Sequence, residues 1–388
     1  MIPFSERMEK VTGSAIREIF TLLARPGMIS FAGGNPSPDT FPAGDVAKIT
    51  AELMESSGGT VLQYGATPGW GPLRESVAEM VARKGISAEK SDIVILTGSS
   101  QGIDLVSKIF LNDGDVILTE APTFLGALQT FRTYRAEPVG VRVDEGGMDM
   151  ADLEDKLVKT HAKVIYTIPT FQNPTGRTLD AARREKMLGL AKKYGAIILE
   201  DDPYGDLRYS DEPVKPIFTL DHAEDTVIYL GSFSKVISPG LRVGFAVAKP
   251  EIIQKMTIAK QGADVHTSNL SQAIVDKYIR SGKLYPHIQE CCAYYTVQRD
   301  AMVNAIRKYL PDTVRYTVPD GGIFIWAALE TGESALDLFK RAVENNVAFV
   351  PGVHFFPDLS GENTLRLNFS MCSADTIEEG VRRLGGLL

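Results

Sequence analysis

The middle of the chain alternates short apolar runs with longer amphipathic stretches. The apolar runs are rich in β-branched residues, and several are apolar at consecutive positions; they span 93–97, 116–120, 138–143, 163–169, 196–201, 227–231 and 243–248. Consecutive apolar positions are typical of strands that are covered on both faces. The pattern predicts an α/β fold in which helices cover a mostly parallel, seven-stranded sheet.

The two flanks of this region predict further elements. A helical stretch over 13–24 precedes a Gly/Pro-rich segment over 29–42, which we expect to lie over a surface without forming an element, and Pro72 is expected to open a helix that runs to Lys84. After residue 280, a helical stretch over 285–309 leads to alternating strands and a final helix. We therefore expect three parts: an N-terminal arm over 1–40 that belongs to the small domain, a large domain over 41–280 and a smaller α+β domain over 281–388.

Composition and charge narrow the class of protein. The 388 residues are 44% hydrophobic and 23% charged, and the net charge of −8 comes from acidic and basic residues that are interleaved along the chain. Neither nucleic acid nor an anionic membrane is indicated as a partner. No signal-like or membrane-spanning stretch is present, so we expect a cytoplasmic protein. The three cysteines and five histidines lack the spacing of metal ligands, and we expect no metal.

One lysine follows the apolar run at 227–231. Ser232 and Lys235 lie in a Gly-Ser-Phe-Ser-Lys loop, and Arg242 comes seven residues later. A buried amine beside other cations loses its proton near neutral pH and becomes a nucleophile toward a carbonyl group. Hydroxyls and a guanidinium suit a dianionic phosphate. The loop is consistent with pyridoxal phosphate, the commonest aldehyde carried on a phosphate, but also with a solvated strand end.

Further polar side chains follow other predicted strands, where ligands of open parallel sheets bind. Ser99 and Ser100 open a helix, either to offer donors to an anion or to cap the helix. Phe124 comes after the second run, either to stack on a planar ring or to pack in the core. Asn173 lies in a Gln-Asn-Pro-Thr-Gly turn. The glycine motifs of dinucleotide and nucleoside triphosphate sites are absent from the sequence.

Asp201 ends the fifth run and Tyr204 follows it, in a Glu-Asp-Asp-Pro-Tyr segment. An ionised carboxylate against a pyridine nitrogen keeps that nitrogen protonated, so that the ring withdraws electrons from a carbanion. Tyr204 and Asn173 are then placed to donate to the phenolate oxygen of the ring. An ordinary acidic loop is the alternative for this segment.

Together these motifs resemble the fold-type I pyridoxal phosphate enzymes, specifically the class I/II aminotransferases of the aspartate aminotransferase superfamily. The chain looks most like the 2-aminoadipate and kynurenine aminotransferase branch, and the resemblance covers nearly its whole length. The motifs that match in order and spacing include QNPTG, EDDPY, GSFSKVISPGLRVGFAVA and the segment 363–370. The resemblance implies that Lys235 holds the cofactor covalently and that Asp201 pairs with its pyridine nitrogen. It also implies a phosphate site formed by Ser99, Ser100, Ser232 and Arg242.

The resemblance further implies how substrate and partner subunit are recognised. Arg366 would clamp the substrate α-carboxylate, near the Gly34 backbone and Asn173. Arg17 would read a distal carboxylate and swing away for apolar side chains, although a place on a solvated face is equally consistent with its position. Tyr64 would reach the phosphate of a second subunit in a homodimer. The branch usually has a tyrosine where this chain has Phe124, so stacking on the ring is kept and a hydroxyl contact is lost.

The sequence therefore predicts a pyridoxal phosphate-dependent aminotransferase with a ping-pong mechanism. Its substrates would be an L-amino acid (2-aminoadipate, aromatic or aliphatic) and 2-oxoglutarate. A β-lyase or decarboxylase on the same scaffold is one alternative, because the fate of the carbanion depends on which bond stands perpendicular to the ring. A ligand sensor without catalysis is another. Such sensors usually carry an N-terminal DNA-binding domain, for which we expect no room because the aminotransferase pattern begins near Ser14.

Overall fold

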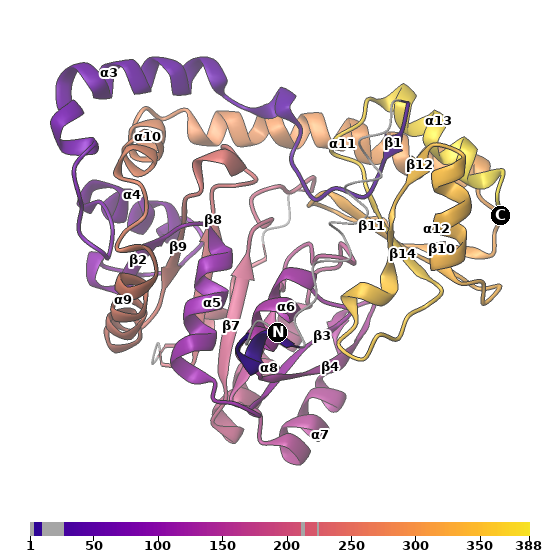
Figure 1. The fold of residues 1–388 in the computed structure, drawn as a ribbon, viewed down its shortest axis with the longest axis horizontal. Helices are drawn as coiled ribbons and strands as arrows, with labels where there is room; N and C mark the ends of the chain where they lie inside the picture. Colours follow the sequence, from indigo (N-terminus) through magenta and orange to yellow (C-terminus); the bar gives the residue numbers. More distant parts are fainter. Residues whose placement is uncertain (1–3, 10–26, 211–213, 223–224) are drawn as a thin grey trace.

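The computed structural model describes residues 4–9, 27–210, 214–222 and 225–388. Within these residues, eight strands form one sheet in the order β2-β9-β8-β7-β6-β3-β4-β5 (Figure 1). The strands are β2 (Ile93–Leu96), β3 (Val116–Ala121), β4 (Glu137–Asp144), β5 (Gly147–Met148), β6 (Val164–Thr167), β7 (Ile197–Asp202), β8 (Val227–Ser232) and β9 (Gly244–Val247). The predicted α/β fold is confirmed. The two-residue strand β5 is an addition, and β9 runs antiparallel to both of its neighbours.

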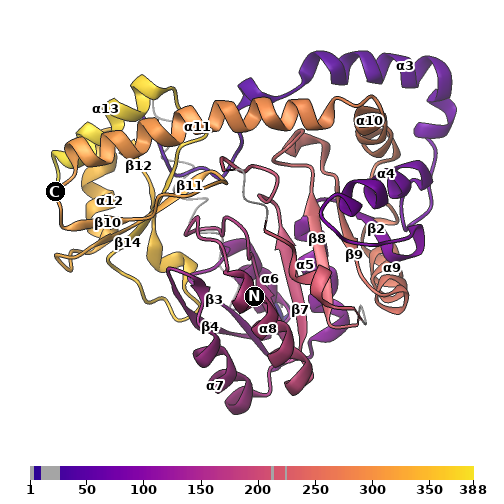
Figure 2. The same cartoon turned by 180° about the vertical axis from the view of Figure 1, so that it is seen from behind.

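Helices cover both faces of this sheet. Helices α5 (Ser99–Phe110) and α6 (Leu125–Thr133) pack together on one face, and α7 (Met150–Thr160) and α8 (Ala181–Tyr194) pack together on the other (Figures 1 and 2). The central strands β6 and β8 are almost entirely buried because each has a helix layer above and below it. The double cover explains why their sequences are apolar at consecutive positions.

A second, smaller sheet lies beside the first. Its strands run antiparallel in the order β10-β11-β14-β13. They are β10 (Val314–Tyr316), β11 (Phe324–Leu329), β14 (Thr364–Asn368) and β13 (Val350–Pro351), with helices α12 (Ala335–Glu344) and α13 (Ala374–Gly385) beside them. The long helix α11 (Leu284–Tyr309) runs from the side of the large sheet to the small one (Figure 2).

The segment over 29–42 differs from the prediction. It forms the short strand β1 (Ile29–Ser30), which pairs parallel with β12 (Val347–Ala348), and the turn of 3₁₀-helix η1 (Pro38–Thr40). Phe31 is fully buried, since Gly380 of α13 leaves room for its ring: a Cβ on Gly380 would lie 2.5 Å from Phe31 Cζ. The first part of the segment therefore packs in the core, whereas Asn35, Pro38 and Asp39 are exposed. The Gly/Pro content had predicted a segment that lies over the surface along its whole length and forms no element.

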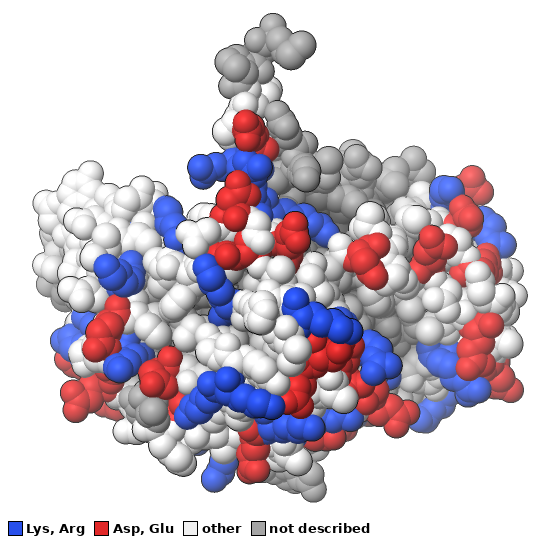
Figure 3. Space-filling view, turned by 90° about the horizontal axis from the view of Figure 1, so that it is seen from below, with Lys and Arg blue, Asp and Glu red and all other residues white. Residues whose placement is uncertain are grey.

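The remaining helices are α1 (Glu6–Glu9), α3 (Ala43–Val61), α4 (Gly71–Ala82), α9 (Pro250–Asp264) and α10 (Asn269–Arg280). Among them, α4 and α9 contact the edge strand β2, α10 packs against α3 and α4, and α1 contacts α6. Helix α4 ends two residues before the predicted Lys84, and the predicted helix over 13–24 lies outside the described residues. None of the described helices is both long and apolar enough to cross a bilayer. On the face shown in Figure 3, Lys and Arg side chains are intermixed with Asp and Glu side chains.

Candidate active site

A cavity of about 340 Å³ lies at the carboxyl ends of the large-sheet strands. It gathers residues that are far apart in the sequence, because the carboxyl ends of parallel strands meet at one edge of a sheet. The predicted site residues that line it are Gly34, Ser99, Ser100, Phe124, Asn173, Asp201, Tyr204, Ser232, Lys235, Arg242 and Arg366. Two predicted residues are not among them. Arg17 lies outside the described residues, and Tyr64 is 81% exposed on the surface of this chain.

Lys235 projects into the cavity from the loop after β8. Its Nζ donates a hydrogen bond to the Gly34 carbonyl oxygen over 2.7 Å. Burial lowers the pKa of Lys235 to about 8, and the positive charges of Arg366 and Arg242 act in the same direction. A sizeable fraction of the amine is therefore neutral near physiological pH, as a nucleophile toward an aldehyde must be.

Asp201 lies at the tip of β7 and is 2% exposed. Its Oδ2 accepts a hydrogen bond from the Tyr166 hydroxyl over 3.0 Å, whereas its buried Oδ1 has no partner among the described residues. Burial raises the pKa of Asp201 to about 7, and the Tyr166 hydroxyl and the nearby Ser99 hydroxyl oppose this rise. A protonated ring nitrogen would give Oδ1 the partner it lacks and favour the ionised carboxylate.

A set of anion-binding groups closes one end of the cavity. Helix α5 begins at Ser99 after Gly98, which has a φ of +81°. Arg242 also has a left-handed backbone, with a φ of 52°, and its Nη2 donates to the Thr97 carbonyl oxygen over 3.1 Å. A Cβ on Gly98 would lie 2.4 Å from that Nη2 atom, so only glycine allows the guanidinium this close to the helix start. The free N–H groups of α5 and the Arg242 fork suit a phosphate.

Arg366 of β14 faces the cavity from the small sheet. Its Nη1 donates to Asn173 Oδ1 over 2.9 Å, and its Nη2 donates to the Ala32 carbonyl oxygen over 2.8 Å. The guanidinium carbon lies 4.2 Å from the ring centroid of Phe324 and 5.0 Å from that of Phe355. Burial lowers the pKa of Arg366 to about 10, so the group remains charged at neutral pH. The Arg366 guanidinium is thus fixed in place and charged, and its Nε lacks a partner among the described residues. Such a group is suited to bind a carboxylate.

The turn that carries Asn173 is anchored by hydrogen bonds of the neighbouring Gln172 side chain. The Gln172 side-chain amide donates to the Pro122 carbonyl oxygen over 2.7 Å and to Glu120 Oε2 over 3.3 Å. Burial raises the pKa of the nearby Tyr204 phenol, which keeps it a hydrogen-bond donor. The turn that carries Asn173 is thus held in place before any ligand binds, and the Tyr204 phenol stays protonated.

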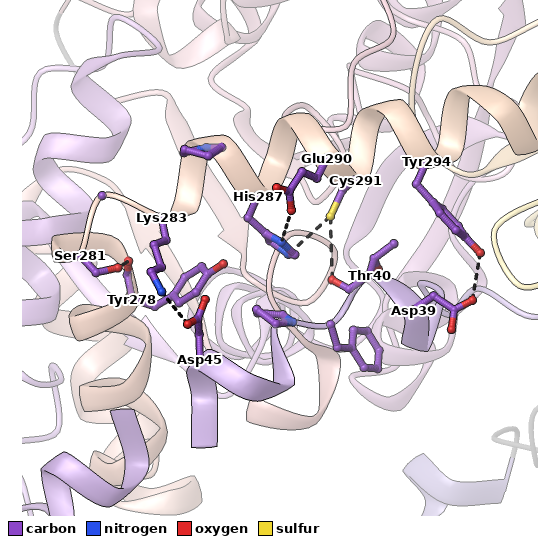
Figure 4. A pocket seen from close by; sticks show the side chains of 14 residues that line it. Asp39, Thr40, Asp45, Tyr278, Ser281, Lys283, His287, Glu290, Cys291 and Tyr294 are labelled. Carbon is purple, nitrogen blue, oxygen red and sulfur yellow. Dashed lines mark hydrogen bonds and ion pairs between the residues drawn. The ribbon is translucent and has the colours of Figure 1, made fainter. Parts of the chain in front are cut away.

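A separate cavity of about 490 Å³ lies between the start of α3 and the start of α11 (Figure 4). Its polar groups are paired with one another: Lys283 Nζ lies 2.6 Å from Asp45 Oδ1, and Cys291 Sγ lies 3.5 Å from His287 Nε2. None of the predicted site residues lines it. The chemistry that the sequence indicated therefore belongs to the smaller cavity.

Sequence reasoning did not single out two residues of the site. Gly98 lines the cavity within a motif that was recognised, and Tyr166 supports Asp201 without lining the cavity. Ser234, one of the two serines that precede Lys235, lines the cavity as well. The position of Gly98 between a strand and a helix was a usable signal, since a tight approach to an anion favours glycine. The role of Tyr166 could not be predicted from the sequence, because a tyrosine within an apolar run indicates a residue that packs in the core.

Comparison with known proteins identifies the family. The model of the class I and II aminotransferases matches residues 26–384. Aromatic-amino-acid aminotransferase 1 of Thermococcus litoralis is 45% identical over 98% of this chain and 93% of its own length. The 2-aminoadipate transaminase of Thermus thermophilus is 43% identical over 99% of this chain and 96% of its own length.

A solved structure supports the same assignment. The α-aminoadipate aminotransferase of Thermus thermophilus, complexed with N-(5'-phosphopyridoxyl)-L-leucine, is 42% identical and superposes with a TM-score of 0.93 over 99% of this chain and 97% of that one. Class I and II aminotransferases use pyridoxal phosphate, and the unpaired Asp201 Oδ1 together with the anion-binding start of α5 fits that cofactor. This chain belongs to the class I and II aminotransferases.

Proposed function

We propose that the protein transfers amino groups between an L-amino acid and 2-oxoglutarate by a ping-pong mechanism. One observation carries the proposal: a single cavity holds an amine of lowered pKa, an unpaired carboxylate oxygen, an anion site and a buried arginine. These groups correspond to the aldehyde, ring nitrogen and phosphate of pyridoxal phosphate and to the carboxylate of an amino acid. The relatives of prokaryotic origin support a cytoplasmic location.

Each chemical task is assigned to residues of this chain. Lys235 would bind the cofactor aldehyde until the substrate amine replaces it there, and its freed, neutral Nζ would then carry the proton from the substrate Cα to the C4′ carbon of the cofactor. Asp201 would pair with the ring nitrogen, and Asn173 and Tyr204 would donate to the phenolate oxygen. The α5 start with Ser99, Ser100, Ser232 and Arg242 would bind the phosphate. When bound, pyridoxal phosphate supplies a ring that withdraws electrons from Cα.

The substrate range follows from the cations of the cavity. Among its described lining residues, the cations are Lys235, Arg242 and Arg366, and each already has a task. A distal carboxylate, such as that of 2-aminoadipate or 2-oxoglutarate, therefore needs another cation, for which we propose Arg17. Movement of Arg17 away from the cavity would admit aromatic or aliphatic side chains. The names of the aromatic and 2-aminoadipate relatives support this range.

We further propose a homodimer in which Tyr64 serves the partner's cavity. Tyr64 is 81% exposed and touches His266 edge-on, at 5.9 Å between ring centroids. Leu62 is 69% exposed and Val265 is 45% exposed. Large apolar groups exposed this close to Tyr64 are consistent with a surface that a second copy covers.

Half-reactions of the purified enzyme test the proposal. With one amino acid and no keto acid, the ping-pong mechanism predicts one equivalent of new keto acid per active site, and 2-oxoglutarate then restores the starting absorbance. Release of pyruvate with ammonia would instead identify a β-lyase, and release of carbon dioxide would identify a decarboxylase. No change of the bound cofactor with any amino acid would favour a sensor.

A matched pair of variants tests the role of Arg17. Arg17→Gln should lower kcat/KM for 2-aminoadipate strongly and change kcat/KM for leucine or phenylalanine little. Arg135→Gln serves as the control, because Arg135 forms its ion pairs with Glu6 and Asp113 away from the cavity. Equal losses for acidic and apolar substrates in Arg17→Gln would contradict the assignment.

A further inference from the structure

Tyr166 lies beside Asp201 on the neighbouring strand. Strands β6 and β7 run parallel, with Tyr166 opposite Leu199. Since alternate residues of a strand share a face, Asp201 lies on the same face as Tyr166. The Tyr166 hydroxyl donates to Asp201 Oδ2 over 3.0 Å. Asp201 lines the cavity and Tyr166 does not, so the Tyr166 hydroxyl would act on a bound cofactor through Asp201.

The surroundings of Tyr166 would accommodate a phenylalanine. Its side chain is fully buried, and its ring packs edge-on against Phe131 of α6 at 5.5 Å between centroids. A buried hydroxyl needs a hydrogen-bond partner, and here the partner is the Asp201 carboxylate. The two oxygens of that carboxylate are thus unequal: Oδ2 is held by Tyr166, and Oδ1 is left without a partner among the described residues.

The charges around Asp201 make this hydrogen bond important. Asp202 on the same strand and Glu120 on β3 both raise the pKa of Asp201, in addition to the larger effect of burial. The Tyr166 and Ser99 hydroxyls lower it. A protonated Asp201 would be a neutral donor and could not stabilise a protonated ring nitrogen. Tyr166 supplies part of the stabilisation that favours the carboxylate.

We propose that Tyr166 is a positioning residue that fixes the Asp201 carboxylate, so that Oδ1 is presented to the ring nitrogen of pyridoxal phosphate and the carboxylate stays ionised. The inference rests on the proposed pairing of Asp201 with that nitrogen. Tyr166, a residue of the sheet interior, would thus help to control the protonation of the ring nitrogen of the cofactor.

The variant Tyr166→Phe tests the proposal, since it removes one hydroxyl and keeps the ring against Phe131. A lost hydrogen bond to a buried charged group corresponds to about tenfold or more in binding, so cofactor-stripped Tyr166→Phe should bind pyridoxal phosphate about tenfold more weakly. In NMR spectra of the enzyme with cofactor labelled at the ring nitrogen, the chemical shift of that nitrogen should move toward the value of an unprotonated pyridine. The visible absorbance of the bound cofactor reports the protonation of the nitrogen that joins it to Lys235. The pH midpoint of this change should rise, because a ring with less positive charge makes that nitrogen easier to protonate.

Tyr229→Phe is the matched control. Tyr229 of β8 is also buried, and its hydroxyl donates to Asp202 Oδ2 over 2.6 Å, but neither residue lines the cavity. The control should lose thermal stability without a change in cofactor affinity or in the ring-nitrogen signal. In an Asp201→Asn background, Tyr166→Phe should add no further loss of affinity.

Two results would overturn the role proposed for Tyr166. Wild-type cofactor affinity and a wild-type ring-nitrogen signal in Tyr166→Phe, with only a lower Tm, would show that Tyr166 is a packing residue and overturn the inference. A full additional loss in the Asp201→Asn background would overturn it as well. Failure of the proposed function is a separate outcome, since it would appear as absence of transamination by the wild-type enzyme with its cofactor bound.

Discussion

Substitution of Arg366 by lysine gives a sharp test of substrate recognition. The variant keeps a positive charge but removes the planar fork that is anchored to Asn173 and Ala32 and that stacks near Phe324 and Phe355. A lysine ammonium is a point charge and cannot keep both anchors while it binds a carboxylate through two parallel hydrogen bonds. We therefore expect recognition of the substrate α-carboxylate to weaken while the charge of the cavity stays the same.

The magnitude follows from the number of hydrogen bonds lost. A hydrogen bond to a charged group contributes about 1.5–3 kcal/mol, so losing one of two bonds lowers kcat/KM by about ten- to a hundredfold. The affinity for pyridoxal phosphate should change little, because Arg366 belongs to the small sheet and the phosphate groups lie at α5.

Phenylalanine and phenethylamine provide the matched assay, since they differ only in the α-carboxylate. Arg366→Lys should lower kcat/KM for phenylalanine and leave the slow reaction of phenethylamine unchanged. Equal losses for the two amines would contradict the assignment of Arg366, as would a loss for phenylalanine of less than about threefold.

Three further predictions concern the cofactor site and the core. The pKa of Lys235 near 8 predicts that capture of pyridoxal by the stripped protein accelerates about tenfold per pH unit below about pH 8 and levels off above it, as stopped-flow absorbance would show; a continued rise to pH 10 would contradict this. Gly98→Ala should raise the Kd for pyridoxal phosphate by displacing Arg242 and leave the Kd for pyridoxal unchanged, whereas equal changes in both would argue against a phosphate site. The pKa of the buried Glu120 rises from 4.5 to about 7 on folding, so its contribution to stability is complete below pH 4.5 and is lost as the pH rises through 7. Urea unfolding of Glu120→Gln should show a shallower fall of the unfolding free energy over that range, and an unchanged fall would refute the shift.

The parts of the fold that repeat a local pattern could be predicted from the sequence. Strands β6, β7 and β8 show their double burial by consecutive apolar residues, and the helix start at Ser99 follows directly from the strand before it. The burial of Phe31 could not be predicted, because it depends on the distant strand β12 and on the missing side chain of Gly380. Local Gly/Pro content indicated a surface segment, and tertiary packing overrode it.

The same distinction holds for the site. Lys235, Asp201 and Arg242 lie at strand ends, where their residue types have chemical meaning, and the structure brings them to one cavity. The support of Asp201 by Tyr166 depends on which strand neighbours β7, and strand order was not readable from the sequence. The anchoring of Asn173 by Gln172 and Glu120 was hidden for the same reason, since it joins the ends of β3 and β6.

Reduction of the bound cofactor tests whether Lys235 is the residue that carries pyridoxal phosphate. Treatment of the enzyme with borohydride fixes an imine between a lysine and pyridoxal phosphate, and mass spectrometry of the peptides then locates the modified residue. We expect one phosphopyridoxyl group per chain, on the peptide that contains Lys235, and none in a Lys235→Ala variant of normal fold. Modification of a different lysine, or full transaminase activity in Lys235→Ala, would contradict this role of Lys235.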